Sequence, residues 1–134
     1  MNSLYLEIVC PDRELFSGEV KSVTVTTDNG EIQIMRGHAD LVAALKTGRA
    51  KVVLPDGKER SAAASGGFIL VSGGLVKVVA TTFEFEDTID VERARIAKEA
   101  AEEKIRNAKD AEEIELARLK LERALCRINV AGER

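Results

Sequence analysis

The chain has 134 residues, of which 45% are hydrophobic and 32% charged, so we expect one domain, or a small domain with an appendage. The net charge of -3 argues against a nucleic-acid-binding protein, because contacts with phosphates require clustered positive charge. No apolar run approaches the ~20 residues needed to span a bilayer. The N-terminus also lacks a signal-peptide pattern, so we expect a cytosolic protein.

The first 86 residues have the pattern of a β region, because short apolar and β-branched runs are separated by glycine-containing turns. The run from Leu4 to Cys10 places alternate apolar side chains on one face of a strand, and residues 18–27 and 75–85 form further strand-like runs. The turn signals stand at Asn29-Gly30, Asp56-Gly57 and Gly73-Gly74. This spacing predicts an antiparallel β-sandwich or barrel of about eight to ten strands.

From residue 87 onward the sequence is rich in Ala, Glu, Lys and Arg, which predicts two helices. We expect the first helix over residues 90–107 and the second over residues 111–129. The short connection predicts an antiparallel hairpin. The predicted fold class is α+β, mainly β, with a β-sandwich domain at residues 1–86 followed by a helical hairpin at residues 87–134.

The break between the two predicted helices carries its own signals. Asn107 is expected to end the first helix in a left-handed conformation, which Asn tolerates better than most residues. Asp110 is expected to cap the second helix, with Glu113 at the capping-box position.

The helix faces that should meet in the hairpin are rich in alanine. Full burial of a Leu contributes ~1.5–3 kcal/mol and an Ala contributes much less, so the two helices should adhere weakly. One interpretation is a permanently folded hairpin, and the other is a movable element that a few kcal/mol can switch. The predicted facing positions are Val91, Ala94, Ala97, Ala101, Ile105 and Ala108 on the first helix, and Ile114, Ala117, Leu121, Ala124 and Ile128 on the second.

The sequence shows no catalytic or metal-binding constellation. His38 is the single histidine, and it forms no convincing zinc site with two cysteines from unrelated segments. We expect Cys10 and Cys126 to be small apolar residues, buried or half-buried. An enzyme is therefore the least favoured interpretation.

The basic residues of the helices are better placed for a function. Arg93 lies one turn after Asp90, and Arg123 and Arg127 share a face of the second helix. An antiparallel hairpin would bring all three arginines near the N-terminus of the first helix, where the helix dipole is positive. Such a cluster suits a polyanion such as nucleotide phosphate, or acidic side chains of a partner. The alternative is an ordinary solvated helix face.

A series of short motifs resembles one known family. In order they are "PDRELFSGEVKSV", "DNGEI", "GHADL", "DGK", "SGGF", "IDVERA" and a charged tail ending "RALCRINV". Together they resemble the epsilon subunit of bacterial F-type ATP synthases over nearly the whole chain. The resemblance implies a flattened sandwich of about ten strands plus an α-hairpin. It also implies a non-catalytic rotor subunit of the central stalk, which couples ion translocation to ATP synthesis.

The resemblance implies several partners, and a location at the cytoplasmic side of the bacterial plasma membrane. The sandwich would sit on the gamma subunit and the c-ring, with Glu31 facing the ring and the surface around His38 and Ser65 facing gamma. The extended hairpin would reach the alpha and beta subunits of the catalytic head and block ATP hydrolysis. There Arg118 and Lys120 would pair with acidic residues, a hypothesis motivated by the spacing of basic residues.

The resemblance also implies a nucleotide site, since some members bind ATP as a regulatory ligand. A basic residue of those members corresponds to Ala100 here, which removes a bond worth ~1.5–3 kcal/mol, about tenfold or more in affinity. Gln33 and Arg36 depart from the family pattern in the loop toward the ring. An ATP-sensing module and a purely structural stalk adaptor remain alternatives. The implied nucleotide-binding residues are Glu84, Ile89, Asp90, Arg93, Ala94, Arg123 and Arg127.

Overall fold

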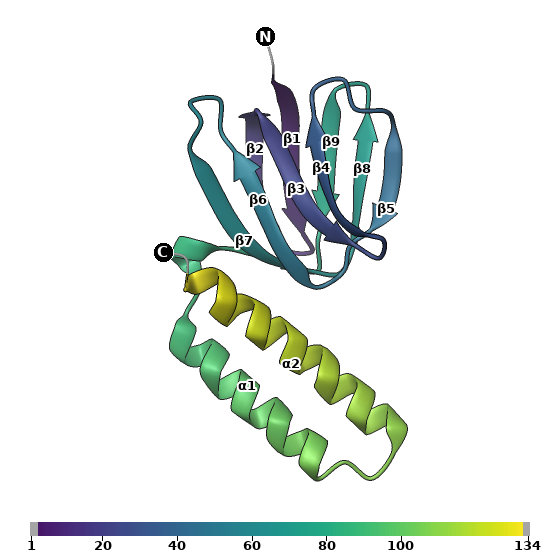
Figure 1. The fold of residues 1–134 in the computed structure, drawn as a ribbon, viewed down its shortest axis with the longest axis vertical. Helices are drawn as coiled ribbons and strands as arrows, with labels where there is room; N and C mark the ends of the chain where they lie inside the picture. The colour runs from purple at the N-terminus through teal and green to yellow at the C-terminus, as the bar shows by residue number, and fades with distance from the viewer. Residues whose placement is uncertain (1–2, 133–134) are drawn as a thin grey trace.

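The computed structural model describes residues 3–132, which form a β-sandwich with a helical hairpin attached at one end (Figure 1). This arrangement confirms the predicted fold class. The elements are β1 (Leu4–Cys10), β2 (Arg13–Val20), β3 (Ser22–Thr27), β4 (Gly30–Met35), β5 (Leu41–Ala44), β6 (Gly48–Val53), β7 (Glu59–Ser65), β8 (Phe68–Ser72), β9 (Leu75–Val79), β10 (Thr82–Phe85), the 3-10 helix η1 (Glu86–Thr88), α1 (Val91–Arg106) and α2 (Ala111–Ala131).

Residues 3–132 contain two five-stranded sheets. The β1 sheet has the strand order β2-β1-β9-β8-β5, and the β7 sheet has the order β10-β7-β6-β3-β4. Neighbouring strands are antiparallel except β1 and β9, so the expectation of a purely antiparallel sandwich is wrong for this pair. Parallel neighbours need a long connection, and here that connection contains most of the sandwich.

Two runs that look continuous in the sequence are divided between the sheets. The run 18–27 breaks at Lys21, so β2 lies in the β1 sheet and β3 in the β7 sheet. The run 75–85 breaks at Ala80 and Thr81, between β9 and β10. At both points the chain passes from one layer to the other, so the two sheets share one core.

The core between the sheets follows the predicted alternation along the first strand. The side chains buried on that face of β1 are Leu4, Leu6, Ile8 and Cys10. Phe83 and Phe85 on β10 are also buried and form an edge-to-face pair with ring centroids 5.3 Å apart. A buried aliphatic side chain contributes about 1.5–3 kcal/mol, so this core supplies most of the stability.

Both helices begin at the predicted aspartates. Asp90 Oδ1 accepts a hydrogen bond from the backbone N–H of Arg93 at 3.1 Å, and Asp110 Oδ1 accepts one from Glu113 at 2.8 Å. The Glu113 carboxylate accepts a bond from the backbone N–H of Lys109 at 2.9 Å, one residue before the position of a standard capping box.

The two helix ends differ from the sequence prediction. Asn107 has φ −100° and ψ 4°, so the expected left-handed conformation is wrong. Its backbone N–H instead donates to the carbonyl of Glu103 at 3.1 Å, which closes the last turn without a left-handed residue. The helix α2 continues to Ala131 rather than ending near Asn129, because Val130 and Ala131 are buried against the sandwich.

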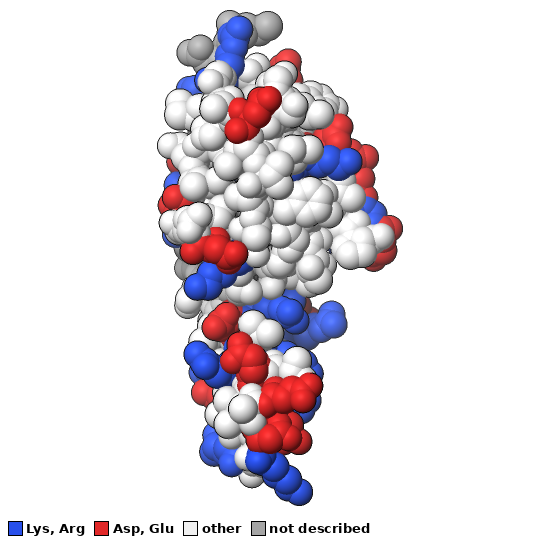
Figure 2. All heavy atoms as spheres, turned by 90° about the vertical axis from the view of Figure 1, so that its right-hand side faces the viewer, with Lys and Arg blue, Asp and Glu red and all other residues white. Residues whose placement is uncertain are grey.

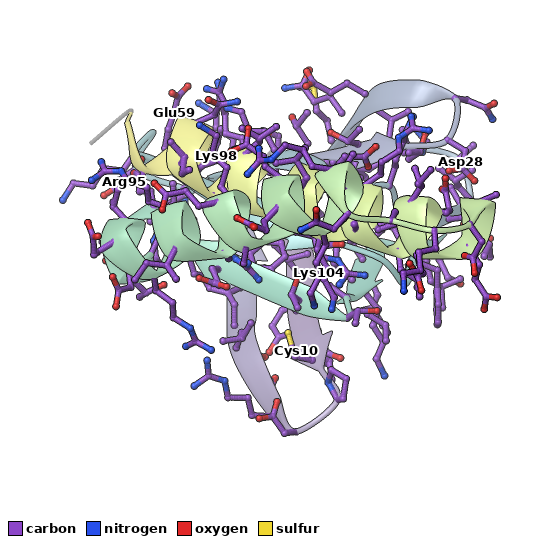
Figure 3. All side chains as sticks on the ribbon, turned by 90° about the horizontal axis from the view of Figure 1, so that it is seen from below. Cys10, Asp28, Glu59, Arg95, Lys98 and Lys104 are labelled. Atoms are coloured by element: carbon purple, nitrogen blue, oxygen red, sulfur yellow. The ribbon has the colours of Figure 1, made fainter. Side chains whose placement is uncertain are left out.

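The helices α1 and α2 run side by side, as the view from below shows (Figure 3). Their seam is rich in alanine, as predicted, and larger side chains at its edges are less well covered. Ile105, Leu121 and Ile128 are half-buried, and Ile114 is exposed. The seam therefore buries little apolar area. The fully buried seam residues are Ala94, Ala101, Ala117 and Ala124.

Charge is distributed unevenly between the two parts of the molecule. Figure 2 shows the side on which β5 and β8 lie in Figure 1. On that side, charged side chains crowd the hairpin, whereas the sandwich presents a broad surface with few of them.

Candidate functional site

A small apolar cluster attaches the hairpin to the sandwich. Ala63 on β7 and Ile89, just before α1, are buried together with Val130 and Ala131 at the end of α2. Val91 and Cys126 pack against this cluster. Burial raises the pKa of the Cys126 thiol. The helix α2 thus lies on β7, whereas α1 reaches the sandwich mainly through α2.

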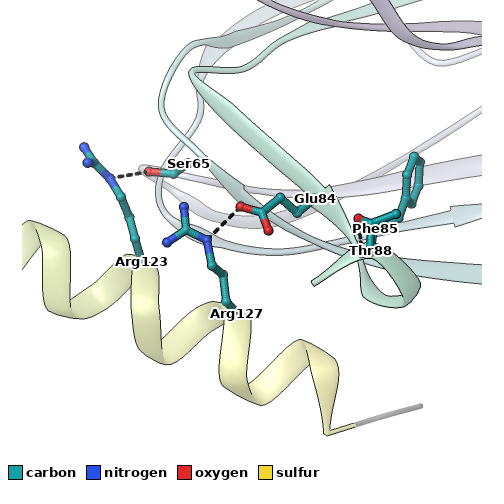
Figure 4. A network of polar contacts seen from close by, with 6 residues as sticks. All are labelled: Ser65, Glu84, Phe85, Thr88, Arg123 and Arg127. Atoms are coloured by element: carbon teal, nitrogen blue, oxygen red, sulfur yellow. Dashed lines mark hydrogen bonds and ion pairs between the residues drawn. The ribbon is translucent and has the colours of Figure 1, made fainter. Parts of the chain in front are cut away.

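Two arginines of α2 form a polar latch beside this cluster (Figure 4). Arg127 Nε donates to Glu84 Oε1 on β10 at 2.8 Å, and Arg123 Nε donates to Ser65 Oγ on β7 at 3.1 Å. Ser65 Oγ also lies 2.9 Å from Thr47 Oγ1. The Arg127 and Glu84 side chains are 24% and 34% exposed, so we expect this ion pair to contribute about 1 kcal/mol.

The joint between sandwich and hairpin is held by a third basic residue. The Arg60 guanidinium on β7 lies over the Phe85 ring at 3.8 Å from its centroid. The same guanidinium lies 3.7 Å from Asp87 Oδ1 in η1. Thr88 Oγ1 donates to the Phe85 carbonyl at 2.8 Å. The chain therefore leaves the sandwich in a defined direction.

A groove of about 550 Å³ lies between β10, the start of α1 and the end of α2. Of the predicted nucleotide-binding residues, Glu84, Asp90, Arg93, Ala94 and Arg127 line it. Ile89 does not line the groove, since it belongs to the apolar attachment cluster. The structure thus brings most of the predicted set to one place.

Arg123 lies in an adjoining groove of about 310 Å³. Thr82, Ala97 and Arg127 line both grooves, so the two are continuous. The expected convergence of three arginines is therefore only partial, because Arg93 and Arg127 share the first groove and Arg127 and Arg123 share the second. The cause is the rise along α2, which separates residues four apart by about 6 Å.

Two of the three charged residues of "IDVERA", Asp90 and Arg93, differ in the contacts that they make. Asp90 caps α1, so one carboxylate oxygen is already bonded to a backbone N–H. The Arg93 side chain makes no hydrogen bond or ion pair with residues 3–132. Arg13 on β2 also lines the groove, and sequence reasoning missed it. No local pattern indicates that a residue on the second strand lies beside the hairpin.

Other site types find no support in the described part of the chain. No group of three or more His, Cys, Asp or Glu side chains in residues 3–132 is arranged to hold a metal ion. Among the helices of the same residues, none is long and apolar enough to cross a membrane.

Known proteins resemble this chain along its whole length. The profile of the ATP synthase delta/epsilon chain β-sandwich domain matches residues 3–86, and that of the long α-helix domain matches residues 87–132. The chain belongs to the ATP synthase delta/epsilon chain family. It is 43% identical to the ATP synthase epsilon chain of Staphylococcus aureus over 132 residues, which is 98% of each chain. It is 37% identical to that of Bacillus pumilus over 133 residues, 99% of this chain and 100% of the relative.

Solved structures agree with the sequence comparison. A chain in the Euglena gracilis mitochondrial ATP synthase assembly of OSCP, F1 and c-ring aligns with a TM-score of 0.82 and 26% identity. The alignment covers 98% of this chain and 82% of that chain. A chain of the Tetrahymena thermophila central stalk and c-ring shares the fold, with a TM-score of 0.60 and 13% identity. The family resemblance is confirmed, and the chain is a central-stalk epsilon subunit, not the catalytic subunit.

The residues expected to contact partners of an epsilon subunit do not form one surface. Glu31 is exposed on β4, and His38 is exposed in the loop after β4, with its Nδ1 2.7 Å from the Ala39 carbonyl oxygen. Ser65 is buried beneath Arg123. On α2, Arg118 pairs with Glu115 at 3.8 Å, and Lys120 is exposed. Contact of these residues with partners stays a prediction.

The departures at Gln33 and Arg36 leave the local fold regular. Gln33 pairs with Thr24 within β4 and β3, and no residue other than glycine has positive φ within residues 3–132. Arg36 is exposed in the turn that follows β4. The loop therefore needs no glycine at position 33.

A surface that sequence reasoning missed is the outer face of the β1 sheet. Strand register puts apolar side chains next to one another there, and the charged residues Glu7 and Lys77 are in register among them. The signal was available, because β8 and β9 are apolar on both faces, which is typical of strands covered on both sides. The exposed large apolar residues on this face are Tyr5, Val42, Phe68 and Leu75.

Proposed function

We propose that this epsilon subunit has two functions in the ATP synthase rotor, each carried by one of its two domains. Residues 1–86 dock on the gamma subunit and the c-ring and so couple ion translocation to ATP synthesis. Residues 87–134 act as a regulatory hairpin that leaves the sandwich, reaches the alpha and beta subunits and restrains ATP hydrolysis. The protein would therefore work at the cytoplasmic side of a bacterial plasma membrane, as a peripheral part of the complex.

The observation that carries the regulatory proposal is the weak attachment of the hairpin. Within residues 3–132, a small apolar cluster, the partly exposed Arg127–Glu84 ion pair and the Arg123–Ser65 hydrogen bond hold α2 to the sandwich, and the exposed Arg60–Asp87 pair holds the joint. None of these contacts belongs to the core between the sheets. Release of the hairpin therefore leaves the sandwich intact, as a two-state regulatory element requires.

The folded hairpin also leaves apolar side chains uncovered. Ile96 is 59% exposed and Leu116 is 56% exposed. Leu119 and Leu125 on α2 are exposed as well. An apolar side chain in contact with water is unfavourable, so its burial against a partner stabilises the bound state of the helix. These side chains support a second docking place for the hairpin.

Removal of residues 88–134 tests the inhibitory role directly. The assembled enzyme with the shortened subunit should hydrolyse ATP faster than the enzyme with the full chain, at equal subunit occupancy. Unchanged hydrolysis would contradict inhibition and favour a purely structural adaptor.

The docking proposal rests on the apolar outer face of the β1 sheet. Phe68 and Val42 lie on neighbouring strands of that face, and each is exposed. Charge introduced by Phe68→Glu should weaken assembly with the gamma subunit, whereas Lys58→Glu, at an exposed position in the turn between β6 and β7, is the control. If both variants co-purify with gamma as well as the wild type, this face is not the docking surface.

A second candidate function is ATP sensing. It is favoured by the groove and by Arg93, whose side chain has no hydrogen-bond or ion-pair partner within residues 3–132. ATP in this groove would touch both α1 and α2 and would stabilise the folded hairpin in proportion to its occupancy. Calorimetric titration of the isolated chain should detect ATP binding, and Arg93→Ala should weaken it about tenfold or more. No binding at millimolar ATP would exclude this candidate and leave the inhibitory proposal in place.

A further inference from the structure

The 3-10 helix η1, which leads from the sandwich into α1, is held to the sandwich by side-chain contacts that do not involve α2. The Phe85 ring at its start is buried and lies edge-to-face to Phe83. The Arg60 guanidinium lies over the Phe85 ring and 3.7 Å from Asp87 Oδ1. Thr88 Oγ1 donates to the Phe85 carbonyl, so η1 stays folded at the end of β10 (Figure 4). Loss of the latch on α2 leaves these contacts in place.

The two residues after η1 are held differently. Ile89 is buried among Ala63, Val130 and Ala131, of which the last two belong to α2. The backbone of Ile89 is extended, with φ −74° and ψ 125°, and Asp90 is extended as well. Departure of α2 therefore uncovers Ile89, and the chain can turn at these two residues. Hinges in proteins are commonly a few such residues at the end of an element.

A pivot of two residues limits where a released hairpin can go. Each residue of an extended chain spans ~3.3–3.6 Å, so opening the three residues of η1 as well adds about 10 Å of reach. It also widens the range of directions that α1 can take. A wider range weakens docking of the hairpin on a partner, because more orientational freedom is then lost on binding.

We propose that Arg60 is a positioning residue, which keeps η1 on the sandwich after the hairpin is released and so confines the pivot to Ile89 and Asp90. The proposal rests on the proposed release of the hairpin and adds a second control point to it. The latch sets how often the hairpin leaves, whereas Arg60 sets the direction and reach of the hairpin once it has left. Loss of the latch should therefore strengthen inhibition, and loss of Arg60 should weaken it.

Hydrogen exchange of the isolated full chain tests whether Arg60 holds η1. Arg60→Gln removes an ion pair and a cation–π contact, so the amides of residues 86–89 should exchange about threefold faster or more. The amides of residues 94–101, which report release of the hairpin, should keep their rates. Lys58→Gln, at an exposed position just before β7, removes the same charge and should change neither set. Circular dichroism verifies the folding of each variant.

ATP hydrolysis by the assembled enzyme tests the positioning role. Arg60→Gln should raise hydrolysis, and Lys58→Gln should leave it unchanged. Arg60→Lys keeps the positive charge and should restore most of the inhibition. Asp87→Asn breaks only the ion pair, at an exposed position outside the core, and should shift exchange and hydrolysis in the same direction as Arg60→Gln, by about twofold.

The outcomes separate this proposal from the inhibitory role itself. Unchanged exchange of residues 86–89 in both Arg60→Gln and Asp87→Asn would overturn the proposal. Slower hydrolysis together with faster exchange of residues 94–101 would also overturn it, because Arg60 would then belong to the latch. Hydrolysis that rises on removal of residues 88–134 but not with Arg60→Gln would make the contact merely structural. If removal of residues 88–134 has no effect either, the inhibitory role fails, and exchange of residues 86–89 alone decides whether Arg60 holds η1.

Discussion

Two apolar clusters hold residues 3–132 together, and they differ in size and composition. The sandwich core contains twenty buried residues, among them Leu6, Ile8 and Ile34, whereas the cluster under the hairpin contains four. The first is closed on both sides by sheets, and the second lies on the outer face of the β7 sheet, at Ala63. Because hydrophobic stabilisation follows the apolar area buried, the hairpin should detach at a free-energy cost far below that of unfolding the sandwich.

The polar contacts show the same contrast. Inside the sandwich the backbone ladders bind each strand to its neighbours, as the continuous register of β6 and β7 illustrates. Between sandwich and hairpin the contacts are made by long side chains, Arg123 and Arg127. Long side chains lose rotamer entropy when they are fixed, which offsets part of what their bonds contribute. The hairpin is therefore attached to the sandwich more weakly than the strands are attached to one another.

The largest expected effect is on the sandwich. Leu6→Ala removes a fully buried side chain from the centre of the core and should lower the free energy of unfolding by about 2–5 kcal/mol. Denaturant unfolding followed by far-ultraviolet circular dichroism measures this change. Leu116→Ala on the exposed side of α2 is the control and should change stability little. Equal losses in the two variants would contradict the contrast between the clusters.

A change under the hairpin should have a smaller and local effect. Val130→Ala removes two buried methyl groups, at about 0.8 kcal/mol per buried carbon, so we expect a loss of about 1–2 kcal/mol. The loss should appear as faster hydrogen exchange of the amides of residues 94–101, while those of β1 stay protected. A free Ala-rich helix of this length is only marginally stable in water. Uniform deprotection of both parts would show that the hairpin and sandwich unfold as one unit.

Loss of the latch should lower the free energy that keeps the hairpin on the sandwich by about 1 kcal/mol. Arg127→Ala breaks the ion pair with Glu84 and should shift the hairpin toward release. Because we propose that the released hairpin is the inhibitory form, the assembled enzyme should hydrolyse ATP more slowly with this variant. Arg106→Ala, whose partner Glu103 is a residue of the same helix, should leave the latch intact. Faster hydrolysis with Arg127→Ala would reverse the proposed direction of the switch.

Local patterns in the sequence predicted the features that depend on near neighbours. Alternation identified the buried face of β1, aspartate positions identified both helix starts, and alanine spacing identified the helix seam. Each of these features is set by residues within a turn or a strand of each other. The groove was predicted in part, because Asp90 and Arg93 lie in one such segment.

The remainder depends on contacts that no local pattern encodes. The parallel pairing of β1 with β9 and the breaks near Lys21 and Ala80 follow from how two layers close around one core. The last turn of α2 exists because Ala63 of the sandwich covers it. Arg13 joins the groove through the position of β2. Residues far apart in sequence decide all of these, and periodicity carries no information about them.

The reactivity of the two cysteines allows opening of the sandwich and release of the hairpin to be measured separately. Cys10 lies in the sandwich core, whereas Cys126 is half-buried on the side of α2 that packs against the attachment cluster. Burial raises the pKa of both thiols. The thiolate is the reactive form, so both should react slowly with a disulfide reagent while the hairpin is folded. Release exposes Cys126 alone and returns its pKa toward the ordinary value. The released form loses its proton at lower pH, so stability of the folded hairpin should fall as pH rises past that ordinary value.

Arg127→Ala should therefore speed modification of Cys126 and leave Cys10 slow, with a larger difference at higher pH. Mass spectrometry of the modified peptides assigns each site, and the Cys10→Ser and Cys126→Ser variants verify the assignment. Parallel acceleration at both cysteines would mean that the sandwich opens together with the hairpin. If the hairpin detaches while the sandwich stays folded, only the modification rate of Cys126 should rise.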